Sequence, residues 1–332
     1  MRPKRTYLLI FIFGAILLPF FLLQCKTNSH QVSVLGKFEN PTDNPLTEEK
    51  IALGRLLFFD KRLSRNETVS CATCHVPSFA FTDRKKVSEG VEGRKTQRNS
   101  PSLLNSAYLK TLMFDAHLTS LEIQVIAPIQ EHVEMDMDMK TLLSRLRKDE
   151  HYAKEAKAIF NRDFDAFVLT RSIAAFERSL ISENSRFDQY YSGIKPNALS
   201  KNEKAGWKLF SEKLYCTQCH PAPYFTTFIA ENNGLYSEYG EDKGRFRIFN
   251  DSNDIGFFKV PSLRNIELTF PYMHDGSKST LDEVIQHYSR GGEHHTLQSK
   301  KIVPFKLTAK ETSQLKAFLI ALTDTSYMKD FR

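Results

Sequence analysis

The sequence predicts a mainly α fold of two domains that are related by internal duplication and carry long irregular loops. Two strings of the form C-x-x-C-H, at residues 71–75 and 216–220, are each surrounded by the same short patterns. Apolar residues recur mostly at helical spacing, whereas the alternation that marks strands is scarce. Such a repeat indicates that each half of the chain folds into a similar unit.

Composition limits the class of protein. The 332 residues are 41% hydrophobic and 26% charged, enough for one large or two ordinary domains with their own cores. This balance excludes disordered, collagen-like and coiled-coil proteins, and a mean hydropathy of −0.38 excludes a membrane protein with many spans. The excess of 46 Lys and Arg over 39 Asp and Glu is modest and contains no long basic run, so no nucleic-acid binding is expected.

Residues 1–24 are typical of a lipoprotein signal peptide. Basic residues at 2–5 precede an apolar run at 7–23, and Cys25 stands just after that run. A Cys at this position resembles a bacterial lipobox, in which the processed Cys25 carries the lipid, although Gln24 is larger than the residue usual there. The alternatives are an uncleaved membrane anchor and a soluble exported form. All three interpretations place the body of the protein outside the cytoplasm.

The next segment, residues 25–45, is polar and contains Pro41 and Pro45, which is typical of a tether. We expect an N-terminal domain over 46–185 and a C-terminal domain over 186–332. Helical spacing of apolar residues predicts helices over 46–58, 119–131, 137–160, 164–182, 200–213, 279–289 and 308–323.

The duplication is visible on both sides of each C-x-x-C-H string. The pattern Gly-x-x-Leu-Phe begins at Gly54 and again at Gly206, before each string. The pattern Pro-Ser-Leu-x-Asn follows each string, at 101–105 and at 261–265. The two halves are therefore expected to build two copies of one site.

The C-x-x-C-H strings consist of Cys71, Cys74 and His75 in the first half and of Cys216, Cys219 and His220 in the second. Two thiols one helical turn apart can add to the two vinyl groups of one porphyrin, and the adjacent His then presents its imidazole to the iron. A redox-active Cys pair and half of a zinc site are the alternatives, but neither requires a His after each pair. With Cys25 assigned to lipid, the four other thiols account for two covalent haem c groups in two cytochrome-c-like domains.

Longer strings resemble the bacterial di-haem cytochrome c peroxidase family, which includes the methylamine-utilisation protein MauG. The resemblance covers about 45–325 and matches both halves in order. Its strings are CATCH, Arg98-Asn99-Ser-Pro-Ser-Leu-Leu-Asn105, Gln124…Glu134-Met135, Lys243-Gly-Arg245-Phe246 and Pro261-Ser-Leu-Arg264-Asn265…Gly276. The resemblance implies a peroxide-reactive N-terminal haem, a six-coordinate C-terminal haem that relays electrons, and a calcium ion between them.

The resemblance assigns the acid/base role in peroxide cleavage to Glu134 and the placing of peroxide to Gln124. Cleavage needs an open iron face and a group that carries a proton from the inner to the outer oxygen. The alternative is that Glu134 is one more acid in the run 131–138, at a solvated helix start.

The calcium site of such proteins uses one Asn side chain and backbone carbonyls, which the resemblance places at Asn99, Thr269 and Pro271. Oxygen ligands of this kind suit calcium. The alternative for Asn99 is an ordinary turn residue.

Two departures from the peroxidase pattern concern the N-terminal haem. Simple peroxidases carry a labile His after the first string that blocks the iron, but residues 76–100 contain no His here. Glu92, or another residue of 89–93, lies in that region instead. Where a Trp often lies between the haems, this chain has Phe114, which can pack in the gap and shorten it for electron transfer.

A third departure concerns the C-terminal haem. The position of its sixth ligand, commonly Met in peroxidases and Tyr in MauG-type proteins, is held here by Tyr288. His287 and Met273 are rival ligands, and a Tyr that only packs on the porphyrin is the alternative.

These expectations describe a periplasmic enzyme, lipid-anchored to a bacterial membrane, that reduces hydrogen peroxide to water. A small c-type cytochrome or cupredoxin would supply the electrons, and a homodimer is a further candidate assembly. One alternative is a MauG-like oxidase that acts on a protein or organic substrate through high-valent haem. The other is a di-haem electron-transfer protein without enzymatic activity.

Overall fold

Helices account for most of the regular structure in the computed structural model, which describes residues 33–331. The described strands, β1 (Ala230–Glu231) and β2 (Phe258–Lys259), form one short antiparallel pair in which Ala230 faces Lys259. The predicted mainly α fold with long irregular loops is confirmed. The predicted signal peptide and Cys25 lie outside the described residues. Over residues 33–331, no helix combines the length and the apolar character needed to cross a membrane.

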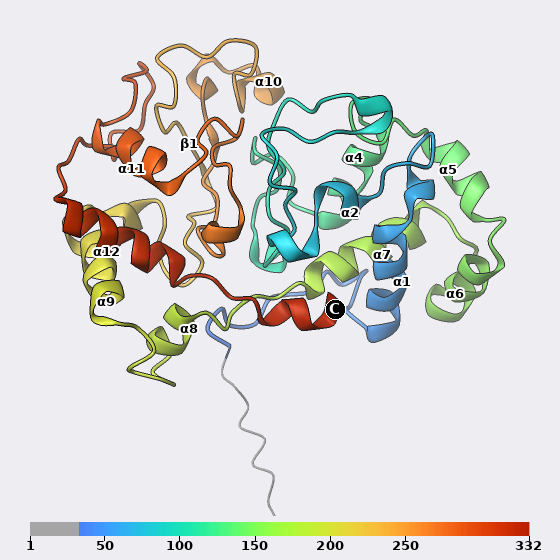
Figure 1. Ribbon diagram of the computed structural model, residues 1–332. Helices are drawn as coiled ribbons and strands as arrows, with labels where there is room; N and C mark the ends of the chain where they lie inside the picture. The colour runs from blue at the N-terminus through green and yellow to red at the C-terminus, as the bar shows by residue number, and fades with distance from the viewer. Residues whose placement is uncertain (1–32, 332) are drawn as a thin grey trace, which may run out of the picture. The chain divides into compact units, whose positions relative to one another are not determined.

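One helix pair lies at the centre of each half (Figure 1). The pairs are α1 (Glu48–Phe59) with α7 (Ala166–Ser179), and α9 (Lys201–Lys208) with α12 (Ala309–Ile320). A Cβ atom on Gly54 would lie 1.8 Å from the carbonyl oxygen of Ser172, and one on Gly206 would lie 2.0 Å from that of Gln314. Any larger residue would push the helices apart. The repeated Gly-x-x-Leu-Phe pattern therefore reflects one helix crossing that is built twice.

The other helices of the first half are α2 (Cys71–Cys74), α3 (Leu121–Gln124), α4 (Ile126–Gln130), α5 (Met139–Leu146) and α6 (Glu150–Phe160). The predictions of one continuous helix over 119–131 and of another over 137–160 are wrong, because two shorter helices form in each range. The second division occurs where Asp149 accepts hydrogen bonds from the backbone N–H groups of His151 and Tyr152. An N-cap of this kind starts a new helix although the apolar spacing runs across it.

The second half adds α8 (Arg186–Tyr191), α10 (Phe246–Phe249) and α11 (Leu281–Ser289). Each half has its own hydrophobic core, one around Phe58 and Phe176 and the other around Phe187 and Phe318. The predicted boundary at 185/186 falls between these cores. The end of the chain, however, returns to the first core, where Phe331 packs edge-on against Phe176, as Figure 1 shows for the last red segment beside α1 and α7.

The prediction of a tether over 25–45 is wrong for residues 33–45, which pack on the domain. Leu35 is only 2% exposed, and Asn44 is fully buried. The Asn44 amide donates to Glu122 Oε1 at 2.8 Å, and its Oδ1 accepts from Lys50 Nζ at 3.2 Å. Glu122 also pairs with Arg178, so Asn44 belongs to a buried polar network, while Lys37, Glu39, Asn40, Thr42 and Asp43 are exposed.

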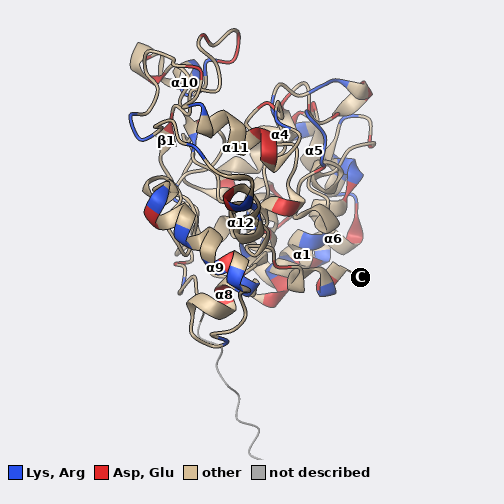
Figure 2. Cartoon of the chain, turned by 60° about the vertical axis from the view of Figure 1, so that its left-hand side comes forward, with Lys and Arg blue, Asp and Glu red and all other residues tan. Residues whose placement is uncertain are grey.

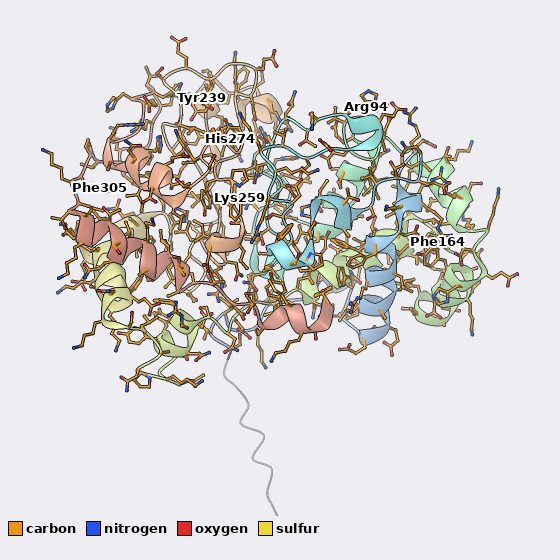
Figure 3. All side chains as sticks on the ribbon, in the orientation of Figure 1. Arg94, Phe164, Tyr239, Lys259, His274 and Phe305 are labelled. Carbon is orange, nitrogen blue, oxygen red and sulfur yellow. The ribbon has the colours of Figure 1, made fainter. Side chains whose placement is uncertain are left out.

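Loops of the first half and loops of the second half are joined by ion pairs. Arg98 donates to Asp242 of the second half at 2.6 Å and to the fully buried Asp115 at 2.9 Å. Asp115 also accepts from Arg247 Nε at 3.2 Å. Figure 3 shows Lys259 and His274 in this central region, where second-half loops reach the first half. The charge network therefore fixes the loops that carry the site residues.

Candidate functional site

A cavity of about 740 Å³ contains residues of both C-x-x-C-H strings. Its walls include Cys74 and His75 from the first string and Cys216, Cys219 and His220 from the second. Cys71 packs on the first core next to it. The predicted residues Gln124, Glu134, Phe114, Tyr288, Asn99, Thr269 and Pro271 line the same cavity. The fold thus brings nearly all the predicted site residues into one continuous space.

The two string histidines are held in the same way. His75 follows α2, and its Nδ1 lies 2.9 Å from the carbonyl oxygen of Phe81. His220 has Nδ1 at 2.9 Å from the carbonyl oxygen of Phe225. Burial lowers the pKa of both imidazoles, so each is neutral with the Nδ1 proton donated to the carbonyl. The hydrogen bond from Nδ1 to a backbone carbonyl selects the tautomer with the proton on Nδ1. Nε2 of both rings is therefore available as an iron ligand.

The four cysteines of the strings form no disulfide within the described chain. Burial is the main cause that raises the pKa of Cys74 to about 11 and of Cys216 to about 12, so both are neutral thiols at pH 7. Across the described residues, no group of three or more His, Cys, Asp or Glu side chains is arranged to hold a metal ion. Paired thiols, an adjacent neutral His and a shared cavity fit two covalently bound haems.

Glu134 lines this cavity and is partly buried. It follows α4 in a turn where its backbone oxygen accepts from Val91 N–H at 2.8 Å. Gly90 allows that approach, because a Cβ there would lie 2.4 Å from the Glu134 oxygen. Burial, with a smaller contribution from the neighbouring charge of Glu131, raises the pKa of Glu134 to about 7. A carboxyl with this pKa can both accept and release a proton near neutral pH, as an acid/base group requires.

Gln124 ends α3 and lines the cavity with Glu134. Its Nε2 lies 3.9 Å from Met113 Sδ, a weak contact that leaves the amide available to a small polar molecule. The structure thus brings together the two residues that the sequence assigned to peroxide chemistry.

Glu92 lies elsewhere. Its carboxylate pairs with Arg65 and Arg94 at the surface, and the hydrogen bond from Arg94 is the largest cause that lowers its pKa. Neither Glu92 nor its neighbours in 89–93 line the cavity. The arginine pair therefore holds the Glu92 carboxylate away from the cavity.

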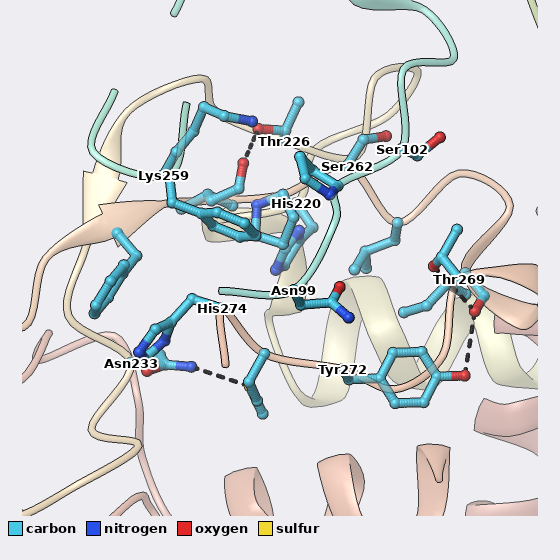
Figure 4. Close-up of a pocket in the computed structure, with 18 of the residues that line it drawn as sticks. Asn99, Ser102, His220, Thr226, Asn233, Lys259, Ser262, Thr269, Tyr272 and His274 are labelled. Atoms are coloured by element: carbon cyan, nitrogen blue, oxygen red, sulfur yellow. Dashed lines mark hydrogen bonds between the residues drawn. The ribbon is translucent and has the colours of Figure 1, made fainter. Parts of the chain in front are cut away.

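The three candidate sixth ligands at the second site are separated by the structure. Tyr288 at the end of α11 and Met273 both line the cavity. His287 is fully buried on the other face, with Nε2 at 3.1 Å from the carbonyl oxygen of Asn233. Burial raises the pKa of Tyr288, whereas a hydrogen bond from Asn233 lowers it. Asn233, which Figure 4 labels, also donates to Met273 Sδ at 3.4 Å. One amide that the sequence did not reveal therefore contacts both remaining candidates.

The candidate calcium ligands share the cavity wall, as Figure 4 shows for Asn99 and Thr269. Asn99 donates through Nδ2 to the carbonyl oxygen of Lys85 at 2.7 Å, and its backbone N–H donates to that of His274 at 2.8 Å. Its Oδ1 makes no hydrogen bond within the described chain. A free amide oxygen with neighbouring carbonyls suits calcium, and the site stays a prediction.

Sequence reasoning missed Lys259, which also lines the cavity (Figure 4). Its backbone N–H donates to the carbonyl oxygen of Phe114 at 2.7 Å, so the two halves are joined at the residue predicted to lie between the haems. Burial lowers the pKa of its ammonium group to about 8. The only sequence signal was its place beside the repeated Pro-Ser-Leu-x-Asn pattern.

Two neutral histidines, each next to a thiol pair and both facing one cavity, define a c-type cytochrome with two haems. Comparison with known proteins agrees with this class. The family model described as di-haem cytochrome c peroxidase matches residues 48–196. The chain belongs to the di-haem cytochrome c peroxidase and MauG family, as the resemblance predicted.

Two relatives and one solved structure illustrate the match. Cytochrome-c peroxidase IdrP1 of Pseudomonas sp. (strain SCT) is 34% identical over 85% of this chain and 83% of its own length. Methylamine utilization protein MauG of Methylorubrum extorquens is 36% identical over 85% of this chain and 80% of its own length. A crystal structure of a MauG-like protein associated with microbial copper homeostasis superposes with a TM-score of 0.85 at 37% identity, covering 91% of this chain and 97% of that one.

Proposed function

We propose that this chain is an exported peroxidase that reduces hydrogen peroxide to water with electrons from a small c-type cytochrome or cupredoxin. One observation carries the proposal: Glu134 faces the cavity that also contains His75, and its pKa of about 7 suits proton transfer. Family membership supports the coarser statement, an oxidoreductase with two haem c groups. Relatives named cytochrome-c peroxidase support the proposal that this oxidoreductase reduces peroxide.

Bound haem would supply the iron that takes up peroxide and the electrons that cleave its O–O bond. In the ionised form, Glu134 accepts the proton of the inner peroxide oxygen and returns it to the outer oxygen, which leaves as water. The Gln124 amide orients the peroxide for this transfer. Two electrons and two protons convert one peroxide into two water molecules, and we assign the transfer of a proton between the two oxygens to Glu134.

The hydrogen bond from Lys259 N–H to the Phe114 carbonyl gives a short backbone connection between the halves, at 2.7 Å. Phe114 itself lines the cavity between the two strings. We therefore propose that electrons pass from the second site to the first through this connection.

MauG-like oxidation of a protein or organic substrate is the second candidate. Tyr288 in the cavity wall and the 37% identity with a solved MauG-like protein favour it. The deciding experiment follows the peroxide-dependent oxidation of reduced cytochrome c and of a reduced cupredoxin by the purified holoprotein. Peroxidase activity predicts two donor molecules oxidised per peroxide. Consumption of peroxide without oxidation of either donor would favour the second candidate.

The fully oxidised protein is expected to react with peroxide at once, without prior reduction. Residues 76–100 contain no His, and Glu92 is held at the surface by Arg65 and Arg94, so neither can close the first iron. Stopped-flow mixing with stoichiometric peroxide should remove the high-spin absorption band within the first phase. A spectrum that changes only after ascorbate treatment would contradict this expectation. Protein mixed with buffer alone serves as the control.

We also propose that the protein is periplasmic and lipid-anchored through Cys25. The change Cys25→Ala is expected to abolish incorporation of labelled fatty acid and to leave an unprocessed precursor, because the lipid is added to that thiol. Gel mobility and labelling in growing bacteria measure both effects. Equal labelling of the variant and the unchanged protein would exclude lipid attachment at Cys25.

A further inference from the structure

A buried acid on α7 lies at the cavity without a partner. Glu177 is only 4% exposed and lines the cavity that also contains His75. Its Oε2 has no hydrogen-bond partner in the described chain, and the Ser106 hydroxyl donates to its backbone oxygen at 3.1 Å, not to the carboxyl group. A buried polar group without a partner destabilises a fold, and the steps assigned to Glu134 and Gln124 do not use this one.

Glu177 lies near an attachment thiol of the first haem. Burial is the main cause that raises the pKa of Cys71, and the charge of Glu177 is the next. Cys71 packs on the same hydrophobic core as Phe176, the residue before Glu177. A haem joined to Cys71 would therefore lie close to the carboxyl group, in a buried region where charges interact strongly.

The duplication provides a comparison for this position. A Cβ atom on the crossing glycine would lie 2.9 Å from the Cβ of Phe176 in the first half and 2.7 Å from that of Phe318 in the second. The two Phe residues therefore match, and the residues after them, Glu177 and Leu319, match as well. Leu319 also lines the cavity, and it lies on α12, which Figure 2 shows beside α9. No charged residue of α12 lines the cavity, so this position carries an acid at the first site alone.

Charged groups on the elements packed against α7 have partners of their own. Arg178, the next residue of α7, pairs with Glu122 of α3 at 2.8 Å. Lys50 of α1 donates to residues 44–45, and the Tyr108 hydroxyl donates to a backbone carbonyl at 3.0 Å. These partners leave the acid on α7 without a counter-ion.

Burial raises the pKa of Glu177 to about 8, while the charge of Arg178 lowers it and that of Glu122 raises it by smaller amounts. The carboxyl group is therefore mostly protonated at pH 7 and ionises slightly above it. One unit of charge added or removed nearby can shift this balance.

We propose that Glu177 holds a proton for the first haem site: its carboxylate takes up one proton when that haem gains an electron and releases it when the electron leaves. The proton comes from water, the electron comes from the donor, and the O–H bond of the carboxyl group is the bond that forms. The total charge of the buried site then stays the same in both redox states. This inference goes beyond the proposed function, because it applies to either candidate reaction.

The sign of the effect follows from linkage. Oxidised iron carries one more positive charge than reduced iron, so it favours the ionised carboxylate and lowers the pKa of Glu177. Reduction removes that charge and raises the pKa. Between the two values each reduction takes up a proton, and the midpoint potential of the first haem falls as the pH rises.

The experiment titrates the full-length holoprotein electrochemically without peroxide, at pH values from about 6 to 10 around the pKa of this group. The high-spin absorption band reports the first haem, and the low-spin bands report the second. The test variants are Glu177→Gln, which keeps the shape but cannot ionise, and Glu177→Leu, which copies the matching side chain of the second half. The matched control is Glu150→Gln, the same change at an exposed acid of the first half that forms no ion pair within the described chain.

In the unchanged protein and in the Glu150→Gln control, the midpoint potential of the first haem should fall with rising pH around pH 8. In both Glu177 variants this fall should be lost, with two haems still bound. The Glu134→Gln variant should retain it, because the pKa of Glu134 is about 7. Infrared difference spectra should show the carbonyl band of a protonated carboxyl group on reduction of the unchanged protein, and lack that band in both Glu177 variants.

The unchanged protein can overturn the proposal without any variant, if the potential of its first haem does not depend on pH in this range. An equal pH dependence in both Glu177 variants would also overturn it. Loss of the dependence in Glu134→Gln alone would assign the proton to Glu134 instead. The proposed function can fail separately, since these titrations contain no peroxide and require no turnover.

Discussion

Replacing Cys216 and Cys219 together by Ser is expected to leave one covalent haem in the purified protein instead of two. Serine cannot form the thioether bonds, whereas Cys74 and Cys71, which packs on the other core, keep theirs. Denatured-protein mass and the pyridine haemochrome spectrum count the haems directly. Oxidation of a protein donor should fall to background, because we propose that the second site receives the donor's electrons.

A matched control keeps this result interpretable. The change Thr217→Ser, between the two thiols, should retain both haems because it leaves the attachment chemistry intact. The reciprocal pair, Cys71→Ser with Cys74→Ser, should also leave one haem. Two covalent haems in the Cys216 and Cys219 variant would contradict the attachment sites, and one haem in each pair variant shows that the halves load independently.

The change Glu134→Gln is expected to slow the reaction of the oxidised protein with peroxide by roughly 10²–10⁴-fold, the usual contribution of a positioned acid/base. Gln keeps the size of the side chain but cannot accept the peroxide proton. Haem content and the spectrum of the oxidised protein should stay unchanged, which separates lost chemistry from lost folding. Stopped-flow absorbance measures the rate, and a variant as fast as the unchanged protein would exclude Glu134 from the step.

The pH dependence of the same reaction has a defined sign. Glu134 must be ionised to accept a proton, and burial raises its pKa to about 7. The rate should therefore rise with pH, reach half its maximum near pH 7, and level off above it. In the Glu134→Gln variant this rise should disappear.

Glu131 provides a sharp control for that profile. Its charge is one of the two causes that raise the pKa of Glu134. The change Glu131→Gln should move the midpoint to lower pH and leave the maximal rate unaltered, because Glu131 itself is exposed and outside the proposed chemistry. A lower maximal rate with the midpoint in place would show that another group titrates.

Most of the fold could be read from the sequence, because helices in such a protein are marked by local apolar spacing. The repeated glycines are one example: Gly54 and Gly206 both permit the closest approach of two helices. The predictions that were wrong concern segments whose structure depends on contacts between residues far apart in the sequence. Asn44 looked like part of a solvated tether, yet it completes a buried network with Glu122, 78 residues later.

The sequence by itself determined the family and predicted the two haem-attachment sites, since covalent attachment needs only two thiols at fixed spacing and an adjacent His. Tertiary structure alone decided which residues face the cavity and in which protonation state. Glu134 and Glu92 are both acids in loops of the first half, but burial raises the pKa of Glu134 to about 7, whereas the arginine pair lowers that of Glu92. The physical reason is that desolvation and ion pairing are set by neighbours that only folding brings together.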